Sequence, residues 1–187
     1  MDIDIDSANR DEILKLISSV GASIQRNGTT IKHNTGAYVT DIPSDPVTGL
    51  CTLDYNQAED LGYIKLDLLN VSLYERVKNT QHLERLMNQE PDWSKLQDPA
   101  FVERIIHINN HYSTLQKMPE PVNSIPRMAM FLSVIRPAKR HLIGLPWRDV
   151  AKTVWDKPTD GSYYFKHAHS VSYAVLVAVN MNLETES

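Results

Sequence analysis

The first residues of the chain alternate strictly between acidic and apolar side chains, in the sequence MDIDIDS. Successive residues of a β-strand point to opposite faces of a sheet, so alternation by two predicts a strand here. Ile3 and Ile5 would face a core, and Asp2, Asp4 and Asp6 would share the other face. Aspartates are depleted in strands and repel one another at this spacing, so the arrangement calls for a bound cation or a solvated chain end.

The hydrophobic period changes in the segment that follows. Apolar residues at helical spacing predict a helix over residues 10–20, with Gly21 as its C-cap. Residues 36–42 and 49–55 alternate in the manner of strands across a turn-rich connection, which predicts a hairpin with a long loop. A third strand is predicted at residues 62–69, where the apolar positions occupy one face.

From residue 72 onward the pattern is mainly helical. A helix with Asp98 as N-cap and Pro99 in its first turn is predicted to continue to residue 115. The other predicted helices cover residues 72–87, 127–135, 146–155 and 169–181, and a proline-rich connector lies at residues 117–126. The pattern predicts an α+β fold, with a small mixed or antiparallel sheet in residues 1–71 and a mainly helical part in residues 72–187.

Composition sets bounds on the class of protein. The 187 residues are 42% hydrophobic, which suits one domain or two small lobes with an ordinary core. The longest apolar run, YAVLVAV, is too short to cross a bilayer, and the acidic N-terminus is unlike a signal peptide. We therefore expect no membrane association and a cytoplasmic location. The lone Cys51 excludes an internal disulfide and a cysteine-rich zinc site.

Charge is unevenly distributed along the chain. Residues 1–122 contain 11 Lys and Arg against 18 Asp and Glu, whereas residues 123–187 contain 8 against 5. The net charge of −4 argues against a surface coated with basic residues for nucleic acid, yet the C-terminal third is basic. A basic part facing an acidic strand suits an anionic ligand that binds with its cations.

Three carboxylates come from two of the predicted strands. Asp2 and Asp4 on the first strand and Asp67 on the third would cluster if these strands are neighbours. Mg²⁺ takes oxygen ligands, and two such ions about 3.5–4 Å apart clamp the attacking and leaving oxygens of phosphoryl transfer. The residues alone leave two interpretations open, a divalent-metal site or an acidic, solvated chain end.

Five collinear segments resemble the alpha subunit of bacterial DNA polymerase III, a family C DNA polymerase. They are MDIDIDSANRDEI, RNGTTIKHNTGAYVTDIP, AEDLGYIKLDLLNVSLYERV, SIPRMAMFLSVIRPAKRHLIG and FKHAHSVSYAVLVAVNM. In order, these are similar to the family's alternating aspartates followed by RD, its RN and HxxG stretch, its third-aspartate strand, its LIRPGP region and its FNKSHxxxYA helix. The resemblance spans nearly the whole chain and implies a nucleotidyltransferase palm followed by a fingers region.

Carried over to this chain, the resemblance implies a catalytic metal triad of Asp2, Asp4 and Asp67, with Asp6 as a further candidate ligand. Two Mg²⁺ ions, or Mn²⁺ in their place, would activate a primer 3′-hydroxyl against the α-phosphate of a nucleotide triphosphate. The residues expected to contact the nucleotide or the DNA primer-template are Lys65, Arg136, Lys139, Arg140, Lys166, His167, His169 and Tyr173. The implied activity is DNA-directed DNA polymerisation in DNA replication.

The sequence also departs from the family pattern. The thumb insertion, the elements that precede the aspartates with their Gly-Ser loop, and the C-terminal modules have no counterpart in it, and RPGP is replaced by RPAK. We therefore expect a reduced, bacteriophage-encoded palm and fingers protein that acts with a second chain supplying the missing elements. The alternatives are a catalytically inert relative that binds DNA or a replication partner, and a generic α+β binding protein with an acidic N-terminus.

Overall fold

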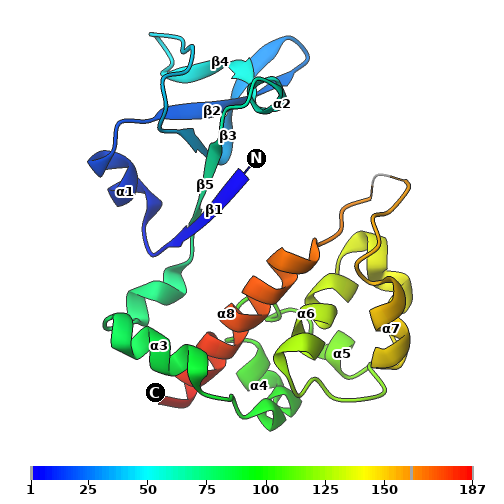
Figure 1. Cartoon of the computed structure of the whole chain (residues 1–187). Helices are drawn as coiled ribbons and strands as arrows, with labels where there is room; N and C mark the ends of the chain where they lie inside the picture. The colour runs from blue at the N-terminus through cyan, green and yellow to red at the C-terminus, as the bar shows by residue number, and fades with distance from the viewer. Residues whose placement is uncertain (1, 161, 187) are drawn as a thin grey trace. The chain divides into compact units, whose positions relative to one another are not determined.

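The computed structural model describes residues 2–160 and 162–186, apart from the side chain of Asp2. The chain divides into two compact units, the first ending at Arg76 and the second beginning at Val77 (Figure 1). The first unit holds the strands and the second is helical, so the predicted α+β class is confirmed. The division falls a few residues after the predicted boundary at residue 71, because a short helix completes the first unit.

The first unit is built around one sheet. Its elements are β1 (Asp2–Ser7), α1 (Arg10–Leu16), β2 (Val20–Arg26), β3 (Thr29–Tyr38), β4 (Leu50–Asp54), α2 (Tyr55–Asp60), β5 (Lys65–Asn70) and the 3-10 helix η1 (Ser72–Arg76). The strand order is β1-β5-β3-β2-β4, and the sheet is mixed. The β1–β5 and β2–β4 pairs are parallel, and the β2–β3 and β3–β5 pairs are antiparallel.

The hairpin of this sheet lies elsewhere than the sequence pattern predicted. β2 and β3 form it, joined at Asn27 and Gly28, which both have positive φ angles of 51° and 76°. An Asn-Gly pair with two positive φ angles gives the tight turn whose twist suits a two-stranded ribbon. The predicted hairpin between residues 36–42 and 49–55 is wrong, because β4 pairs in parallel with β2 and only an isolated bridge joins Ser44 to Cys51.

The predicted helix over residues 10–20 is shorter than expected. Asn9 caps it by accepting a hydrogen bond from the Asp11 N–H, and the helix ends at Leu16. Gly21 is a strand residue, because Val20 and Gly21 pair with β3 instead of closing the helix. Ladder pairing with a distant strand therefore overrides the local helical pattern.

A small core on the sheet holds the first unit together. Its buried members are Ala22, Tyr38, Ile42, Cys51 and Ala58. Burial raises the pKa of the Cys51 thiol, so this lone cysteine is an inert packing residue.

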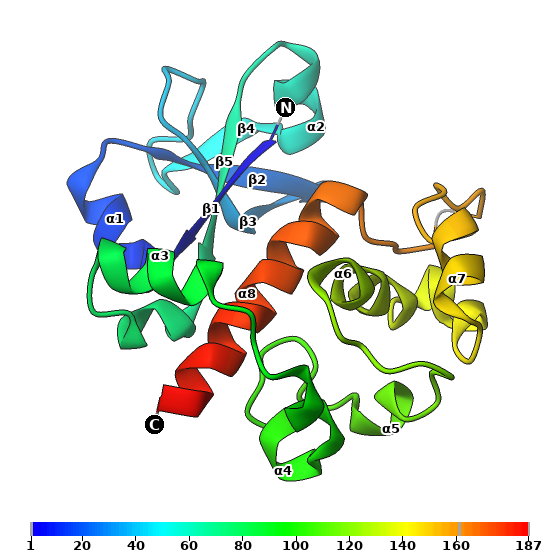
Figure 2. The same ribbon diagram turned by 60° about the horizontal axis from the view of Figure 1, so that its bottom comes forward.

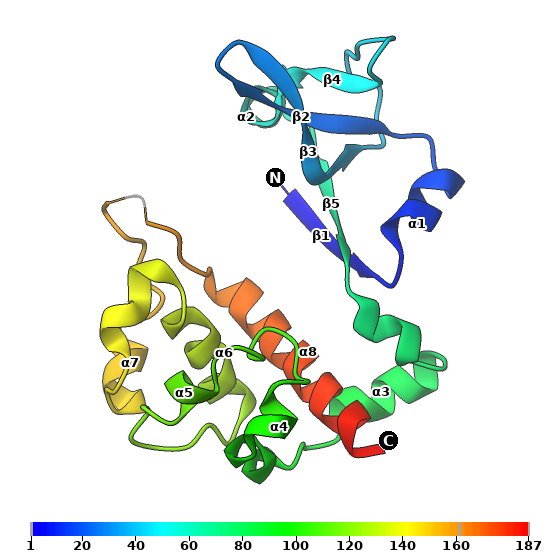
Figure 3. The same ribbon diagram turned by 180° about the vertical axis from the view of Figure 1, so that it is seen from behind.

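The second unit contains the larger core and the longest helix. Its elements are α3 (Thr80–Asn88), η2 (Trp93–Gln97), α4 (Pro99–Val102), α5 (Tyr112–Leu115), α6 (Ile125–Val134), η3 (Pro137–Leu142), α7 (Trp147–Thr153) and α8 (His167–Glu186). Figures 2 and 3 show α6 beside α8, and the buried hydroxyls of Ser133 and Ser170 meet between them at 2.7 Å. His82 of α3 lies 3.0 Å from the Glu186 carboxylate, which ties α3 to the end of α8.

The single helix predicted over residues 98–115 is broken into two short ones. Asp98 does cap its start, with Pro99 in the first turn, but α4 ends at Val102. The intervening backbone turns so that the Ile106 N–H donates to the buried Asn180 Oδ1 at 2.7 Å. Tertiary burial thus outweighs the helical period in this segment. The 72–87 prediction is interrupted in the same way, between η1 and α3.

No helix within 2–160 or 162–186 combines the length and the apolar content that crossing a bilayer requires.

Candidate functional site

β1 and β5 bring the alternating aspartates beside the strand that carries Asp67. The two strands pair in parallel, and their register places Asp4 directly opposite Asp67 and Asp2 opposite Lys65. Residues directly opposite on neighbouring strands share a face of the sheet. The two strands are therefore neighbours, which is the condition for the carboxylate cluster, and their pairing puts Asp4, Asp67 and Lys65 on one face.

The Asp67 carboxylate is held by three side chains from the sheet. Lys65 Nζ lies 2.6 Å from its Oδ2, Thr35 Oγ1 donates to its Oδ1 at 2.8 Å, and His33 Nδ1 lies 3.8 Å from Oδ1. His33 Nδ1 also accepts the Gly36 N–H at 3.0 Å, which orients the His33 ring beside Asp67. The Asp67 side chain is 13% exposed, so its orientation is fixed while solvent still reaches it.

Lys65 is a buried cation on a strand. The residue is 5% exposed, and its ammonium group lies 5.6 Å from the centroid of the Tyr55 ring. Gly36 makes room for it, because a Cβ at this glycine would lie 2.8 Å from Lys65 Cδ and 2.8 Å from the Cβ of Ala22. The packing of Lys65 against Asp67 therefore requires glycine at position 36.

The remaining predicted metal ligands belong to β1. Asp4 and Asp6 are exposed. Partial burial of its carboxyl, and secondly the negative charge of Asp4, raise the pKa of Asp6. The side chain of Asp2, the third predicted ligand, lies outside the described residues. Among the side chains that the structure describes, no three His, Cys, Asp or Glu groups are arranged to hold a metal ion. The described site consists of two carboxylates on one face of the sheet, those of Asp4 and Asp67, and the buried ammonium of Lys65.

Two of the predicted nucleotide-contacting residues meet in the helical unit. Arg136, the residue before η3, places its guanidinium carbon 3.8 Å from the centroid of the Phe165 ring. Tyr173 of α8 stacks on the same ring, with the centroids 5.5 Å apart and the planes at 21°. The His107 and Tyr173 rings pack in a T-shaped arrangement, with their centroids 4.4 Å apart and their planes at 67°. This arrangement is a cation on a small aromatic stack.

The other predicted basic residues have varied surroundings. Lys139 is 5% exposed, and its ammonium group donates to the Thr153 carbonyl at 2.6 Å within the helical unit. His167 is exposed at the start of α8 and stacks on Trp155, with centroids 4.3 Å apart. Lys166 and Arg140 are exposed, and His169 is half-buried on α8. Arg136 and Tyr173 therefore form the group that the structure brings together, whereas Lys139 is enclosed elsewhere.

Residues that position Asp67 were not singled out by sequence reasoning. His33, Thr35 and Gly36 lie together in the segment IKHNTGAY, which carries part of the polymerase resemblance. The HxxG spacing of His33 and Gly36 was the available signal, because it marks a glycine held close to another side chain. Their contacts with β5 depend on a strand pairing that this spacing does not disclose.

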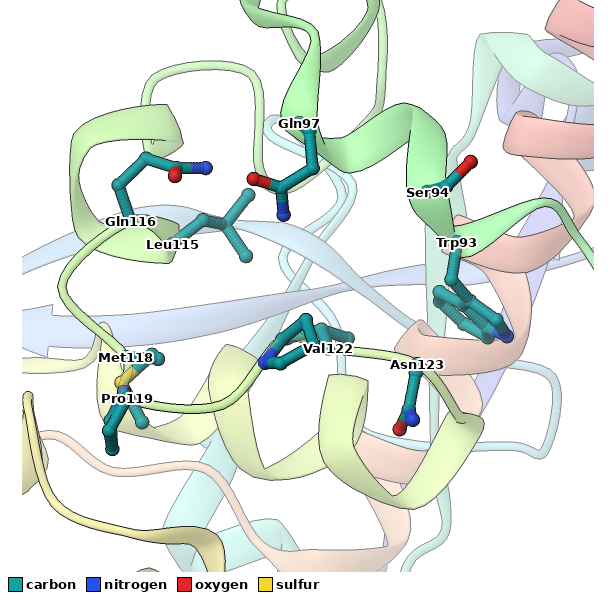
Figure 4. Close-up of a pocket in the computed structure, with 10 residues that line it drawn as sticks. Trp93, Ser94, Gln97, Leu115, Gln116, Met118, Pro119, Val122 and Asn123 are labelled. Carbon is teal, nitrogen blue, oxygen red and sulfur yellow. The ribbon is translucent and has the colours of Figure 1, made fainter.

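A separate pocket of about 540 Å³ opens in the helical unit (Figure 4). Trp93, Leu115, Met118 and Val122 give it apolar walls, and carboxamides such as that of Gln97 add polar groups. The described residues that line it carry no charge. It therefore offers no cation to a phosphate and is distinct from the predicted site.

Two places thus combine charge and geometry in a way that suits phosphate chemistry. One is the face of the sheet that carries Asp4, Asp67 and Lys65, and the other is the aromatic stack under Arg136. No protein-family model, curated protein or solved structure matches the chain.

Proposed function

We propose that the chain is a DNA polymerase III alpha-like protein of DNA replication whose sheet binds divalent cations for nucleotidyl transfer. The observation that carries this proposal is the β1–β5 register, which sets Asp4 directly opposite Asp67. A solvated acidic chain end would not require a neighbouring strand with a carboxylate at the opposite position. The paired strands supply that match.

The donor set supports Mg²⁺ as the cation, with Mn²⁺ as a substitute. Mg²⁺ is commonly held by one or two carboxylates, with water and substrate phosphates in the remaining positions. Asp4 is exposed and the Asp67 side chain is 13% exposed, so solvent reaches both. Thr35 holds one Asp67 oxygen and leaves lone pairs on the carboxylate for a metal. Bound there, the metal would polarise a phosphate and stabilise the charge that develops during transfer.

Lys65 compensates Asp67 when no metal is present. Removing one partner of a buried ion pair leaves an uncompensated charge, which is strongly destabilising. The 2.6 Å contact between Lys65 Nζ and Asp67 Oδ2 avoids that cost. A divalent cation on Asp67 competes with this ammonium, which then becomes available to a substrate phosphate.

The same contact favours a second candidate function. Because Lys65 already neutralises Asp67, the chain would also be stable as a catalytically inert relative that binds DNA or a replication partner. For the catalytic function the proposed ligands are a DNA primer-template and a nucleotide triphosphate. A second chain would supply phosphate-gripping elements, and the setting would be the cytoplasm of a bacterium or of a phage-infected host.

Manganese binding tests the metal site directly. Mn²⁺ is titrated into the whole chain and followed by its electron paramagnetic resonance signal, in wild type, Asp67→Asn and Asp11→Asn. Asp11 is an exposed carboxylate on α1 and serves as the matched control. We expect Asp67→Asn to weaken binding at least tenfold and Asp11→Asn to leave it within about twofold. Equal affinities in all three proteins would contradict the metal site.

DNA binding and extension separate the two candidate functions. Primer extension is measured with the chain alone and with any protein that co-purifies with it. Polymerase activity that Asp67→Asn abolishes supports the catalytic function. Primer-template binding that survives Asp67→Asn, without extension under any condition, supports the inert relative.

A further inference from the structure

The pocket shown in Figure 4 is built mainly from apolar side chains of the helical unit. Leu115, Met118 and Val122 of its walls are at most 8% exposed, so packing in the core of this unit fixes them. The volume of about 540 Å³ falls in the range of about 300–1,000 Å³ that is usual for ligand sites. An apolar group that displaces water from such a hollow gains free energy, because burial of apolar surface is favourable.

Three carboxamide side chains form the rim of this pocket, those of Gln97, Gln116 and Asn123. In Figure 4 the two glutamines lie along one side of the pocket, and Asn123 lies across from them. All three residues are exposed, and their side chains form no hydrogen bond with another described residue, so water satisfies them. A carboxamide offers a carbonyl acceptor and an NH₂ donor, which match the N–H and C=O of a peptide bond. The rim can therefore exchange water for the main chain of a bound peptide.

The wall formed by residues 118–123 is held in place by hydrogen bonds. This segment, MPEPVN, contains two prolines, and the residue before each proline favours an extended backbone. Trp147 Nε1 donates to the Glu120 carbonyl at 3.1 Å, and the Arg127 guanidinium donates to the Pro121 carbonyl at 3.0 Å. Arg127 also pairs with the Glu120 carboxylate at 2.6 Å. The pocket is therefore largely pre-formed, which lowers the ordering cost of binding.

This wall also has a main-chain donor at its exposed end. The Asn123 N–H forms no hydrogen bond with another described residue, and the residue is exposed. Peptides that dock on a protein in an extended form gain affinity from main-chain hydrogen bonds and specificity from side chains held in pockets. The apolar hollow, the three carboxamides and the Asn123 N–H together suit this mode of binding.

The lining also indicates which groups the pocket does not suit. The described residues that line it carry no charge, and burying a charged group without a partner is costly. A nucleobase would be expected to stack on an aromatic face. Trp93, the one aromatic residue among the described lining residues, is 9% exposed, and its indole N–H already donates to Glu90 at 2.5 Å. An aliphatic side chain flanked by peptide bonds fits these walls better than a phosphate, a base or a charged side chain.

We propose that this pocket binds a short, uncharged, extended segment of a partner protein. An aliphatic side chain of that segment enters the hollow, and its peptide groups bond to the carboxamides of Gln97, Gln116 and Asn123. The site lies wholly in the helical unit and needs no metal. It is independent of the sheet site and of the proposed function, so either can fail without the other.

The test uses the whole chain in buffer with EDTA, followed by nitrogen-proton NMR. The main probes are three acetylated and amidated pentapeptides, each with four alanines around a central leucine, aspartate or lysine. N-acetyl-leucine amide and thymidine represent a small neutral amide and a nucleobase. The double variant Gln97→Ala with Gln116→Ala shortens two exposed rim side chains, and Gln81→Ala is the matched control. Gln81 is an exposed glutamine on α3 that does not line the pocket.

We expect saturable, millimolar binding of the leucine peptide, with shifts in the side-chain amide signals of Gln97, Gln116 and Asn123. The aspartate and lysine peptides should bind at least tenfold more weakly, because the walls offer no counter-charge. The double variant should weaken binding of the leucine peptide at least fivefold, and the control should stay within about twofold of wild type. Equal affinity for the three peptides, a double variant equal to the control, or no binding at ten millimolar leucine peptide would overturn the proposal.

The two small probes distinguish an extended segment from other occupants. N-acetyl-leucine amide should bind at least fivefold more weakly than the leucine peptide, because it has fewer peptide groups for the rim. A small amide that binds as tightly as the pentapeptide, or thymidine that binds more tightly, overturns docking of an extended segment. Nuclear Overhauser contacts in the wild-type protein need no variant: leucine methyl groups of the peptide should contact the Met118 methyl group. Contacts confined to residues outside the pocket contradict the proposal.

Discussion

Replacing Lys65 with methionine isolates the ion pair on which the sheet site is built. The substitution keeps a long apolar side chain over the glycine at position 36 and beside Tyr55, but it removes the ammonium that lies 2.6 Å from Asp67 Oδ2. Loss of one partner from a buried ion pair costs about 3–5 kcal/mol. Asp67 keeps its Thr35 hydrogen bond and is 13% exposed, so we expect the low end, about 3 kcal/mol.

Two further variants allow the coupling energy between Lys65 and Asp67 to be measured. Lys32→Met removes an exposed lysine from β3 in the same unit and should change stability by no more than about 0.5 kcal/mol. The double variant Lys65→Met with Asp67→Asn removes both charges, so its loss should fall short of the sum of the single losses by about 2 kcal/mol. Mg²⁺ should stabilise Lys65→Met more than wild type, because the cation takes the place of the missing ammonium.

The assay must report on the sheet unit specifically. Trp93, Trp147 and Trp155 all lie beyond residue 76, so tryptophan fluorescence follows the helical unit alone. Hydrogen exchange of the β5 amides, measured across a urea series, gives the free energy of opening of the sheet. Strictly additive losses in the double variant, or a Lys65→Met loss no larger than that of Lys32→Met, would refute the reasoning.

Two other predictions concern the same unit. Gly28→Ala places a Cβ on a residue with a φ angle of 76°, so it should lower the stability of the sheet by about 1 kcal/mol. Thr29→Ala, at the next residue, should lower it by less. The midpoints of urea unfolding compare the two variants, and equal shifts would contradict the two-residue turn. The pKa of Asp6 is raised in the folded chain above the ordinary aspartate value of 3.8, so folding disfavours the charged carboxylate. The folded chain therefore loses stability as the pH rises above 3.8. Asp6→Asn should therefore be more stable than wild type at pH 7 in EDTA and equal to it near pH 3, and thermal melts that differ equally at both pH values would contradict this.

The site strands could be predicted from the sequence because their pattern is local. Alternation in MDIDIDS and in YIKLDLL indicates strands with one apolar face, and the acidic positions follow from that alternation. The register that sets Asp4 against Asp67 is a property of the pairing and needed the structure. The supporting side chains of Thr35 and His33 were not predicted, because they reach Asp67 across the β3–β5 pair.

The misplaced elements share a physical cause. The helical period over residues 98–115 is real, but a buried hydrogen bond to Asn180 on α8 draws the chain out of the helix near Ile106. The Asn-Gly turn at Asn27 was a local signal of the true hairpin that the sequence interpretation passed over. A positive φ at His107 has no local signal of that kind, because packing from distant residues imposes it.

The parallel pairing of β1 with β5 also sets an order of events during synthesis. β1 leaves the ribosome before the other strands of the sheet, but β5, its partner in the described sheet, is translated after β2, β3 and β4. Such a distant pairing is kinetically slow, since a long loop must close before the contacts form. The β2–β3 hairpin can assemble early, whereas Asp4 meets Asp67 only when residues 65–70 have emerged. A chain stalled before that point would carry its aspartates on a strand with no neighbour, and the nascent protein would gain its candidate site late.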